Sequence, residues 1–283
     1  MTKPFIKWVG GKRQLLPELD KYLPANGFKN YYEPFIGGGG LLFHLQPTQA
    51  VINDFNGELT NTYCQVKYHP KELIALLSRM FECDSKEYYL DVRAWDRQAD
   101  FHQRTQLERA ARFIYLNKAG FNGLWRVNSK GQNNVPYGYR KNLHVDAETI
   151  SDDSQYLHDH DIKIMTGDYC DALKIVKPNS LVYLDPPYLP VTSTASFTGY
   201  TKDGFGLEQQ KALRDWALKL AKERRVKVML SNADVPLLHD LYSDPIFRIH
   251  QVKARRNINS NGKKRGPVGE VIITTYDCGD QHD

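Results

Sequence analysis

The chain of 283 residues has few cysteines, and none of them is placed as a metal site or a disulfide framework would require. The four cysteines, Cys64, Cys83, Cys170 and Cys278, form no Cys-x-x-Cys pair. We therefore expect reduced thiols in a cytoplasmic protein. The nine histidines show no His-x-x-x-His spacing either, so we expect no metal.

Long apolar runs are also missing. No apolar stretch approaches the roughly 18 residues needed to span a bilayer. The first residues, Met-Thr-Lys-Pro-Phe-Ile-Lys-Trp, lack the apolar core of a secretory signal. We therefore expect no membrane association. A hydrophobic content of 41% with 25% charged residues is ordinary for a soluble protein, and the length fits one large domain or a domain with an inserted subdomain.

Acidic residues are absent from two stretches of the chain. Residues 109–145 contain seven Lys/Arg and residues 253–269 contain six, in both cases without Asp or Glu. The net charge of +5 therefore hides clustered positive charge on an otherwise acidic protein. Such clustering is typical of a face that binds a polyanion. The alternative is a basic surface that only faces solvent. The presence of two separate stretches favours polyanion binding over this alternative.

Strands and helices alternate along most of the chain, which predicts an α/β protein with parallel crossovers. Strand character is found at residues 31–35, 50–54, 161–165, 181–184, 226–230 and 270–276, and helical periodicity at 58–117 and 207–223. The helical and polar region at 57–160 interrupts the alternation. We therefore predict a discontinuous catalytic and cofactor-binding domain, residues 1–56 plus 161–283, with an inserted subdomain at 57–160.

The tetrapeptide Asp185-Pro186-Pro187-Tyr188 directly follows the apolar run Ser180–Leu184, which reads as a buried strand. Ligands bind at this edge of open α/β sheets. The prolines hold the turn extended and leave backbone carbonyls without competing donors nearby. The motif thus favours an acceptor-rich pocket with an aromatic wall, suited to a flat base that carries an exocyclic amino group. A proline-rich turn with an incidental Asp is the alternative.

A second candidate site follows the first expected strand. Four glycines, Gly37–Gly40, precede the apolar Leu41-Leu42-Phe43, and Asp54 ends the next strand, where an acidic residue can bind ribose hydroxyls. The loop fits neither a phosphate-loop nor a dinucleotide pattern. S-adenosylmethionine, which has no pyrophosphate, fits it better. Asp168, just past another strand, could accept from the cofactor adenine. A flexible turn and helix N-caps are the alternatives.

Several elements in a fixed order resemble the DNA adenine-N6 methyltransferases of the Dam family, in the α arrangement. They are the segment 5–12, the segment Glu33-Pro34-Phe35-Ile36-Gly37-Gly38-Gly39, an insert and the tetrapeptide at 185–188. The insert contains Asn122-Gly123-Leu124-Trp125-Arg126-Val127-Asn128 and Asn134-Val135-Pro136-Tyr137-Gly138, which are similar to the family's recognition hairpin. The nearest relatives expected are the DpnII-type GATC methylases.

The resemblance implies a fold and a set of site residues. The fold is a Rossmann-like S-adenosylmethionine-dependent methyltransferase sheet with an inserted, mainly helical target-recognition subdomain that carries a β-hairpin. The implied cofactor-binding residues are Trp8, Gly11, Lys12, Glu33, Gly37, Gly39, Asp54, Asp168 and Asp185. The implied catalytic residues are Asp185, Pro186 and Tyr188. The implied DNA-binding residues are Lys7, Phe121, Asn122, Leu124, Arg126, Asn128, Pro136, Arg255, Arg256, Lys263, Lys264 and Arg265.

The implied activity is methyl transfer from S-adenosylmethionine to N6 of adenine in duplex DNA, in GATC. We expect a flipped adenine to stack on Tyr188, with its N6 hydrogens on the Asp185 carboxylate and the Pro186 carbonyl, and direct in-line transfer. A covalent cytosine-C5 route is disfavoured, since no cysteine follows a proline. We expect residues 189–204 to order over the base.

Other interpretations stay open from the sequence. They are methylation of RNA adenine or of cytosine N4, a DNA-binding protein without catalysis on the same fold, and a nucleotide-dependent oxidoreductase, which lacks its fingerprint. The expected partner is double-stranded DNA, and the family resemblance implies a monomer. Two biological settings fit: an enzyme paired with a cognate restriction endonuclease acting on the same site, or a solitary regulatory enzyme.

Overall fold

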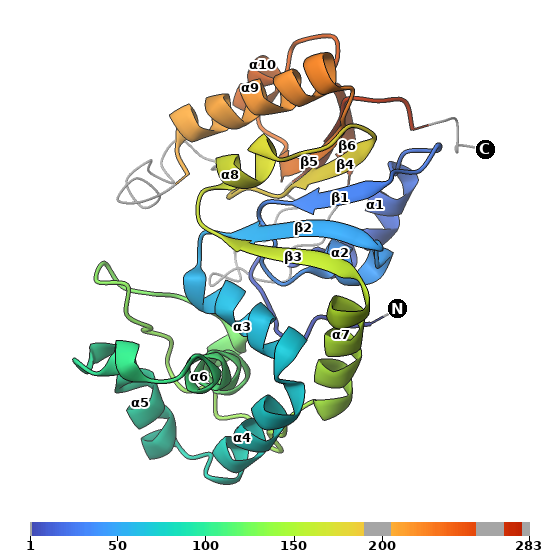
Figure 1. Ribbon diagram of the computed structural model, residues 1–283. Coiled ribbons are helices and arrows are strands. Elements are labelled where there is room, and N and C mark those ends of the chain that lie inside the picture. The colour runs from blue at the N-terminus through green and yellow to red at the C-terminus, as the bar shows by residue number, and fades with distance from the viewer. Residues whose placement is uncertain (1, 190–204, 253–268, 279–283) are drawn as a thin grey trace. The chain divides into compact units, whose positions relative to one another are not determined.

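The strands form one seven-stranded sheet in the order β3-β2-β1-β4-β5-β7-β6 (Figure 1). The structure is a computed structural model that describes residues 2–189, 205–252 and 269–278. The strands are β1 (Asn30–Glu33), β2 (Gln49–Asp54), β3 (Asp161–Thr166), β4 (Ser180–Leu184), β5 (Lys227–Ala233), β6 (Arg248–Val252) and β7 (Glu270–Thr274). Strand β1 pairs in parallel with β2 and β4, and β4 with β5, whereas β7 runs antiparallel to β5 and β6. The predicted α/β sheet is confirmed.

The described ranges contain ten α-helices. They are α1 (Leu16–Lys21), α2 (Gly40–Leu45), α3 (Gly57–Tyr68), α4 (Pro70–Glu82), α5 (Lys86–Ala94), α6 (Gln106–Ala119), α7 (Ala147–Asp159), α8 (Tyr169–Lys174), α9 (Leu207–Arg224) and α10 (Pro236–Leu241). The helical pattern predicted over residues 58–117 is four helices, since caps interrupt it. Ser85 accepts the Tyr88 amide at the start of α5, and Thr105 forms a capping box with Glu108 at the start of α6.

The chain divides into two compact units. The helical unit comprises Met1–Lys12, Ile36–Thr48 and Asn53–Asp168, and the sheet unit comprises Arg13–Phe35, Gln49–Ile52 and Tyr169–Asp283. In the helical unit, α3 packs against α4, α6 and α7. The centre of α6 is fully buried from Ala110 to Asn117, so this helix is the core of its unit.

The core of the sheet unit lies between the strands and α8, α9 and α10. Its buried side chains come from β4 (Val182, Leu184), β5 (Val228, Leu230), β7 (Val271, Ile273) and α9 (Leu213, Ala217, Leu220). Strand β4 is buried at every residue, as expected of a central parallel strand. This packing fixes the C-terminal end of β4, where the Asp185 tetrapeptide begins.

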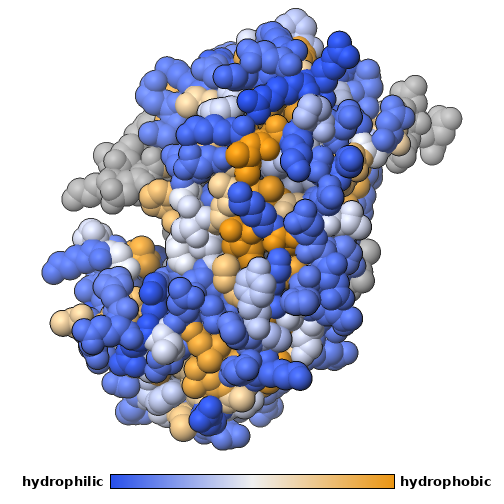
Figure 2. Space-filling model, in the orientation of Figure 1, coloured by the Kyte–Doolittle hydropathy of each residue, from blue (hydrophilic) through white to orange (hydrophobic). Residues whose placement is uncertain are grey.

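The surface drawn in Figure 2 is mostly hydrophilic, with scattered apolar patches. None of the helices in the described ranges is long and apolar enough to cross a membrane. Surface apolar residues of this kind are normal for globular proteins.

Candidate active site and DNA interface

The tetrapeptide 185–188 belongs to the sheet unit and follows the last residue of β4, which pairs with β1. Residues Tyr32 and Val182 are register partners in these parallel strands. Pro186 is buried, Pro187 is exposed, and Asp185 and Tyr188 are half-buried. The predicted arrangement of a carboxylate and an aromatic ring at the carboxyl end of a central strand is therefore present.

Two buried amides hold the tetrapeptide from behind. The Gln210 Nε2 donates to the Pro187 carbonyl at 2.8 Å, and the Leu189 amide donates to Asn232 Oδ1 at 3.0 Å. Asn232 Nδ2 in turn donates to Gln210 Oε1 at 3.3 Å. We predicted that backbone carbonyls of this turn would lack donors nearby. The Pro187 carbonyl does have one, the Gln210 amide. Both amides are fully buried and were missed from the sequence.

Tyr188 lies beside two carboxylates. Burial, followed by the charges of Asp185 and Glu270, raises the pKa of the Tyr188 hydroxyl well above its usual value. The same hydroxyl lies 3.5 Å from Glu270 Oε2, which is the outer limit of a hydrogen bond. The phenol is therefore neutral at physiological pH, and its ring offers an uncharged aromatic face.

Glu33 ends β1 in the same unit and is 3% exposed. Its Oε2 accepts the hydroxyl of Tyr31 at 2.8 Å. Glu33 was predicted as a cofactor ligand. Its place at the carboxyl end of β1, beside β4, is the edge of a parallel sheet where ligands bind.

The glycine loop belongs to the helical unit and is fixed by Asp54. The Gly37 amide donates to Asp54 Oδ2 at 3.0 Å, and the Asn56 amide donates to Oδ1 at 2.9 Å. Burial raises the pKa of Asp54, and these amides offset part of the effect. Asp54 therefore organises the loop, in addition to any contact with a ligand.

Glycine is required in this loop by the protein's own side chains. A Cβ on Gly37 would lie 2.7 Å from Trp8 Cδ1, and one on Gly39 would lie 2.6 Å from the Tyr63 hydroxyl oxygen. The φ angles of Gly37 and Gly39 are +47° and +69°, which disfavour other residues. The glycines were predicted to let the backbone approach a ligand, and they also leave room for Trp8 and Tyr63.

Asp168 is brought close to Asp54 by main-chain bonds of the helical unit. The Gly167 amide donates to the Asp54 carbonyl at 3.0 Å, and Asn53 Nδ2 donates to the Gly167 carbonyl at 3.0 Å. Asp168 itself is exposed. The helical unit therefore gathers Trp8, the glycine loop, Asp54 and Asp168, four of the features predicted to bind the cofactor.

Gly11 and Lys12, also predicted to bind the cofactor, form a turn after Trp8. The Gly11 amide donates to the Trp8 carbonyl at 3.1 Å, and Lys12 Nζ donates to the Gly10 carbonyl at 2.9 Å. Lys12 is buried, with 8% exposure. This turn keeps Trp8 in place beside the glycine loop.

Lys7 is tied to the recognition region by a buried amide that the sequence did not reveal. The Lys7 amide donates to Asn117 Oδ1 at 3.1 Å, and Asn117 Nδ2 donates to the carbonyls of Lys7 and Gly123, at 2.8 and 3.0 Å. Asn117 is fully buried. On the next residue, Trp8 stacks on Phe113, whose ring centroid lies 4.0 Å from that of Trp125. The N-terminal segment and the recognition region are therefore packed together.

The segment 120–138 turns back on itself, but it is less regular than the predicted β-hairpin. Its pairing consists of two isolated bridges, Gly120 with Tyr137 and Val127 with Asn133. Irregular backbone is the reason, because Asn122 has φ +55° and the Asn128 side chain accepts the amides of Lys130 and Gln132 within the turn.

The predicted base-contacting residues lie along this turn with differing exposure. Phe121 is 49% exposed. Asn122, Arg126 and Pro136 are also exposed, and Leu124 and Asn128 are half-buried. Exposed apolar and cationic side chains on one segment suit contact with bases and phosphates.

Some predictions fall outside the described residues. These are the basic residues Arg255, Arg256, Lys263, Lys264 and Arg265, and nearly all of the segment 189–204 that was expected to order over the base.

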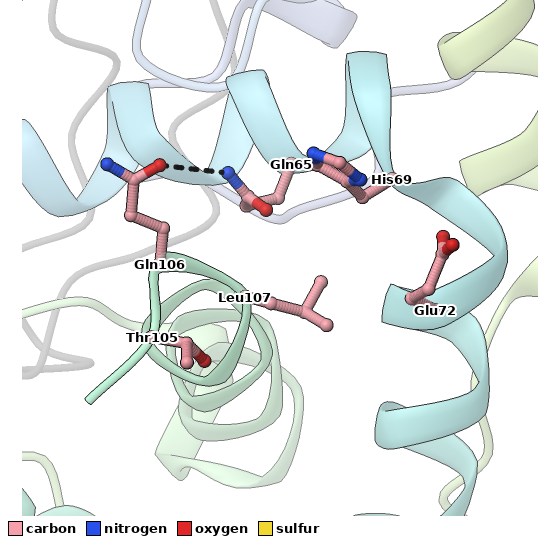
Figure 3. A pocket seen from close by; sticks show the side chains of 6 residues that line it. All are labelled: Gln65, His69, Glu72, Thr105, Gln106 and Leu107. Atoms are coloured by element: carbon pink, nitrogen blue, oxygen red, sulfur yellow. Dashed lines mark hydrogen bonds between the residues drawn. The ribbon is translucent and has the colours of Figure 1, made fainter.

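A surface hollow of about 400 Å³ in the helical unit contains none of the predicted site residues (Figure 3). It lies between α3, α4 and the start of α6, and it is lined by Gln65, His69, Glu72, Thr105, Gln106 and Leu107. Two of these side chains point toward each other, with Gln65 Nε2 donating to Gln106 Oε1 at 3.5 Å (Figure 3).

Comparison with protein families decides the identity of the chain. Residues 8–258 match the family of D12 class N6 adenine-specific DNA methyltransferases. The chain belongs to this family. The matched range includes Trp8, the glycine loop, the recognition segment and the tetrapeptide, so the resemblance seen in the sequence is confirmed, and the protein is a DNA adenine methyltransferase.

The methyltransferase is similar to proteins from bacteria and an archaeon along nearly its whole length. The Type II methyltransferase M1.LlaDCHI of Lactococcus lactis subsp. cremoris is 48% identical, covering 97% of this chain and 95% of that protein. The Type II methyltransferase M.MjaIII of Methanocaldococcus jannaschii is 39% identical, with coverages of 97% and 99%. The DNA adenine methylase of Escherichia coli K12 is 34% identical, with coverages of 96% and 94%.

Proposed function

We propose that this methyltransferase modifies N6 of adenine within GATC in duplex DNA, using S-adenosylmethionine as methyl donor. The observation that carries the chemistry is the Asp185-Pro186-Pro187-Tyr188 tetrapeptide, held at the carboxyl end of β4 by Gln210 and Asn232. The target sequence is proposed from the resemblance of Lys7 and the recognition segment to the GATC methylases. Lys7 and Arg126 offer donors for guanine edges, and Leu124 and Pro136 offer apolar contacts for the thymine methyl.

The residues around the glycine loop fit S-adenosylmethionine chemically. Several of its groups, the ribose hydroxyls, the exocyclic amine, the ammonium and the sulfonium, need acceptors or negative charge. Asp54, Asp168 and Glu33 would supply these, with Trp8, Gly11, Lys12, Gly37 and Gly39 shaping the site. When bound, S-adenosylmethionine supplies an activated methyl group.

The tetrapeptide would hold a flipped adenine. Its amino nitrogen is a poor nucleophile, because the lone pair is delocalised into the ring. Acceptance of its two hydrogens by the Asp185 carboxylate and the Pro186 carbonyl would localise that lone pair, and the neutral Tyr188 ring would stack on the base. Catalysis would then arise from positioning and from negative charge placed where positive charge develops.

The partner proposed is duplex DNA, bound by a monomer in the cytoplasm, with residues 57–160 as the recognition subdomain. The DNA contacts would include Lys7, Phe121, Asn122, Leu124, Arg126, Asn128 and Pro136, together with the basic residues at 255–265. The similarity to Type II methyltransferases supports a partnership with a restriction endonuclease that acts on the same site.

The test is transfer of tritiated methyl groups from S-adenosylmethionine to duplexes that contain GATC, GATC with one base changed, or GATC already N6-methylated on both strands. Label on the first duplex alone is expected. Label on altered duplexes would refute the target sequence, and no label on any would refute the activity. Asp185→Ala is expected to abolish transfer while cofactor binding, measured by calorimetry, is largely retained.

A further inference from the structure

The exposed guanidinium of Arg126 is held along one edge by a single residue. Arg126 Nε donates to Asn134 Oδ1 at 2.7 Å, and Nη2 donates to the Asn134 carbonyl oxygen at 3.2 Å. Within the described ranges Nη1 has no hydrogen-bond partner, and no carboxylate pairs with Arg126. The side chain is therefore oriented by neutral acceptors while its charge and the N–H groups of Nη1 stay available.

The chain around Asn134 alternates between buried and outward-facing side chains, as an extended segment does. Asn133 and Val135 are each 1% exposed, whereas Asn134 is half-buried and Pro136 is exposed. Asn134 and Pro136 thus share the outer side of the segment. They are also on the side that contains Arg126.

Helix α5 and the turn that follows it fix the buried side of this segment. Tyr89 and Arg93 both donate to the Val135 carbonyl, at 3.0 and 2.9 Å. The Asn133 amide donates to Asp96 Oδ2 at 2.7 Å, and the same oxygen pairs with the buried Arg112 at 2.7 Å. The backbone is therefore held on both sides of Asn134, which makes Asn134 a rigid support.

We propose that Asn134 is a positioning residue that orients Arg126 toward a base edge. The proposal rests on the proposed function, in which Arg126 reads a guanine. A guanidinium recognises guanine O6 and N7 by paired hydrogen bonds, and this requires a fixed plane. An arginine that is free to rotate would still attract phosphates, but it would discriminate between bases poorly.

The experiment measures kcat/KM for GATC duplexes and for every single-base replacement, with rates counted per cofactor-binding enzyme. Arg126→Ala identifies the base pair that Arg126 reads. Asn134→Ala should lower discrimination at that same base pair about 10-fold, within the range for one paired contact. The double variant should discriminate no worse than Arg126→Ala. Asn134→Asp keeps the Oδ acceptor and should discriminate between bases as the wild type does. The control is Asn61→Ala, which removes an amide bonded to the Gln106 carbonyl elsewhere in the helical unit and should leave discrimination unchanged.

Several outcomes would overturn the proposal. A uniform loss on all duplexes with Asn134→Ala would indicate a merely structural role. Additive losses of discrimination in the double variant would indicate that the Asn134 amide contacts a phosphate independently of Arg126. A lower kcat/KM for Asn134→Asp than for Asn134→Ala would indicate the same. If Arg126→Ala changes discrimination and Asn134→Ala does not, only this proposal fails. If Arg126→Ala leaves discrimination unchanged, the base-reading role of Arg126 fails as well.

Discussion

Asp153 should make the stability of the helical unit depend on pH. This residue of α7 is fully buried, and within the described ranges neither carboxyl oxygen has a hydrogen-bond partner of good geometry. Burial raises the pKa of Asp153 to about 8, and the Thr2 hydroxyl and the Phe5 amide offset part of that rise. Nearby Asp152 and Asp146 add to the rise. The carboxyl is therefore protonated in the folded protein at neutral pH.

The sign of the effect follows from proton binding. Between about pH 4 and pH 8 the folded chain keeps a proton on Asp153 that the unfolded chain has lost, so stability falls as pH rises. The slope is about 1.4 kcal/mol per pH unit, which gives about 3 kcal/mol between pH 5.5 and 7.5. Asp153→Asn cannot ionise, so this dependence should disappear in the variant.

The assay is urea unfolding of both proteins at a series of pH values, followed by tryptophan fluorescence. The difference in unfolding free energy between Asp153→Asn and wild type should grow by about 3 kcal/mol from pH 5.5 to 7.5. The comparison across pH removes any constant cost of the buried amide. Asp159→Asn, an exposed residue at the end of the same helix, is the control and should leave the pH dependence unchanged. Parallel stability curves for Asp153→Asn and wild type would refute the reasoning.

Two further substitutions test the supports of the site. Gln210→Leu removes the donor to the Pro187 carbonyl, and about 2 kcal/mol of stabilisation of the tetrapeptide is lost with it. We expect kcat to fall by more than about tenfold and the cofactor affinity measured by calorimetry to stay unchanged. An unchanged kcat would contradict this prediction. Gly39→Ala places a Cβ 2.6 Å from the Tyr63 hydroxyl at φ +69° and should lower unfolding free energy by about 1–3 kcal/mol and weaken S-adenosylmethionine binding; full affinity would show that the loop tolerates a side chain.

The fold was largely predictable because its signals are local. The apolar run before Asp185 and the helix at 207–223 appear as β4 and α9. Strand β6 was missed, since Arg248–Val252 has only two apolar residues, lacks the strict alternation of a half-buried strand, and buries only Val252. Helix α7 was not separated from its surroundings, although Asp146 caps it by accepting the Thr149 amide.

The proposed site residues belong to contiguous motifs, whereas the residues that hold these motifs in place are remote in sequence. Asn134 lay within a recognised motif, but nothing in the sequence pairs it with Arg126. Asn232 had a detectable signal, because a side-chain amide in a strand that reads as buried needs a hydrogen-bond partner. That partner, the turn at Leu189, is 43 residues away and cannot be inferred from spacing.

The missed amides share a physical role that explains why they are buried. Asn117, Gln210 and Asn232 are fully buried, and each binds main-chain groups of a segment that has no strand or helix of its own. An irregular segment cannot satisfy its own peptide groups, and an unsatisfied buried group costs about 1–3 kcal/mol. The side-chain amide both removes this cost and fixes the segment. The conformations of the functional loops therefore depend on single distant residues, whereas the sheet depends on many apolar ones.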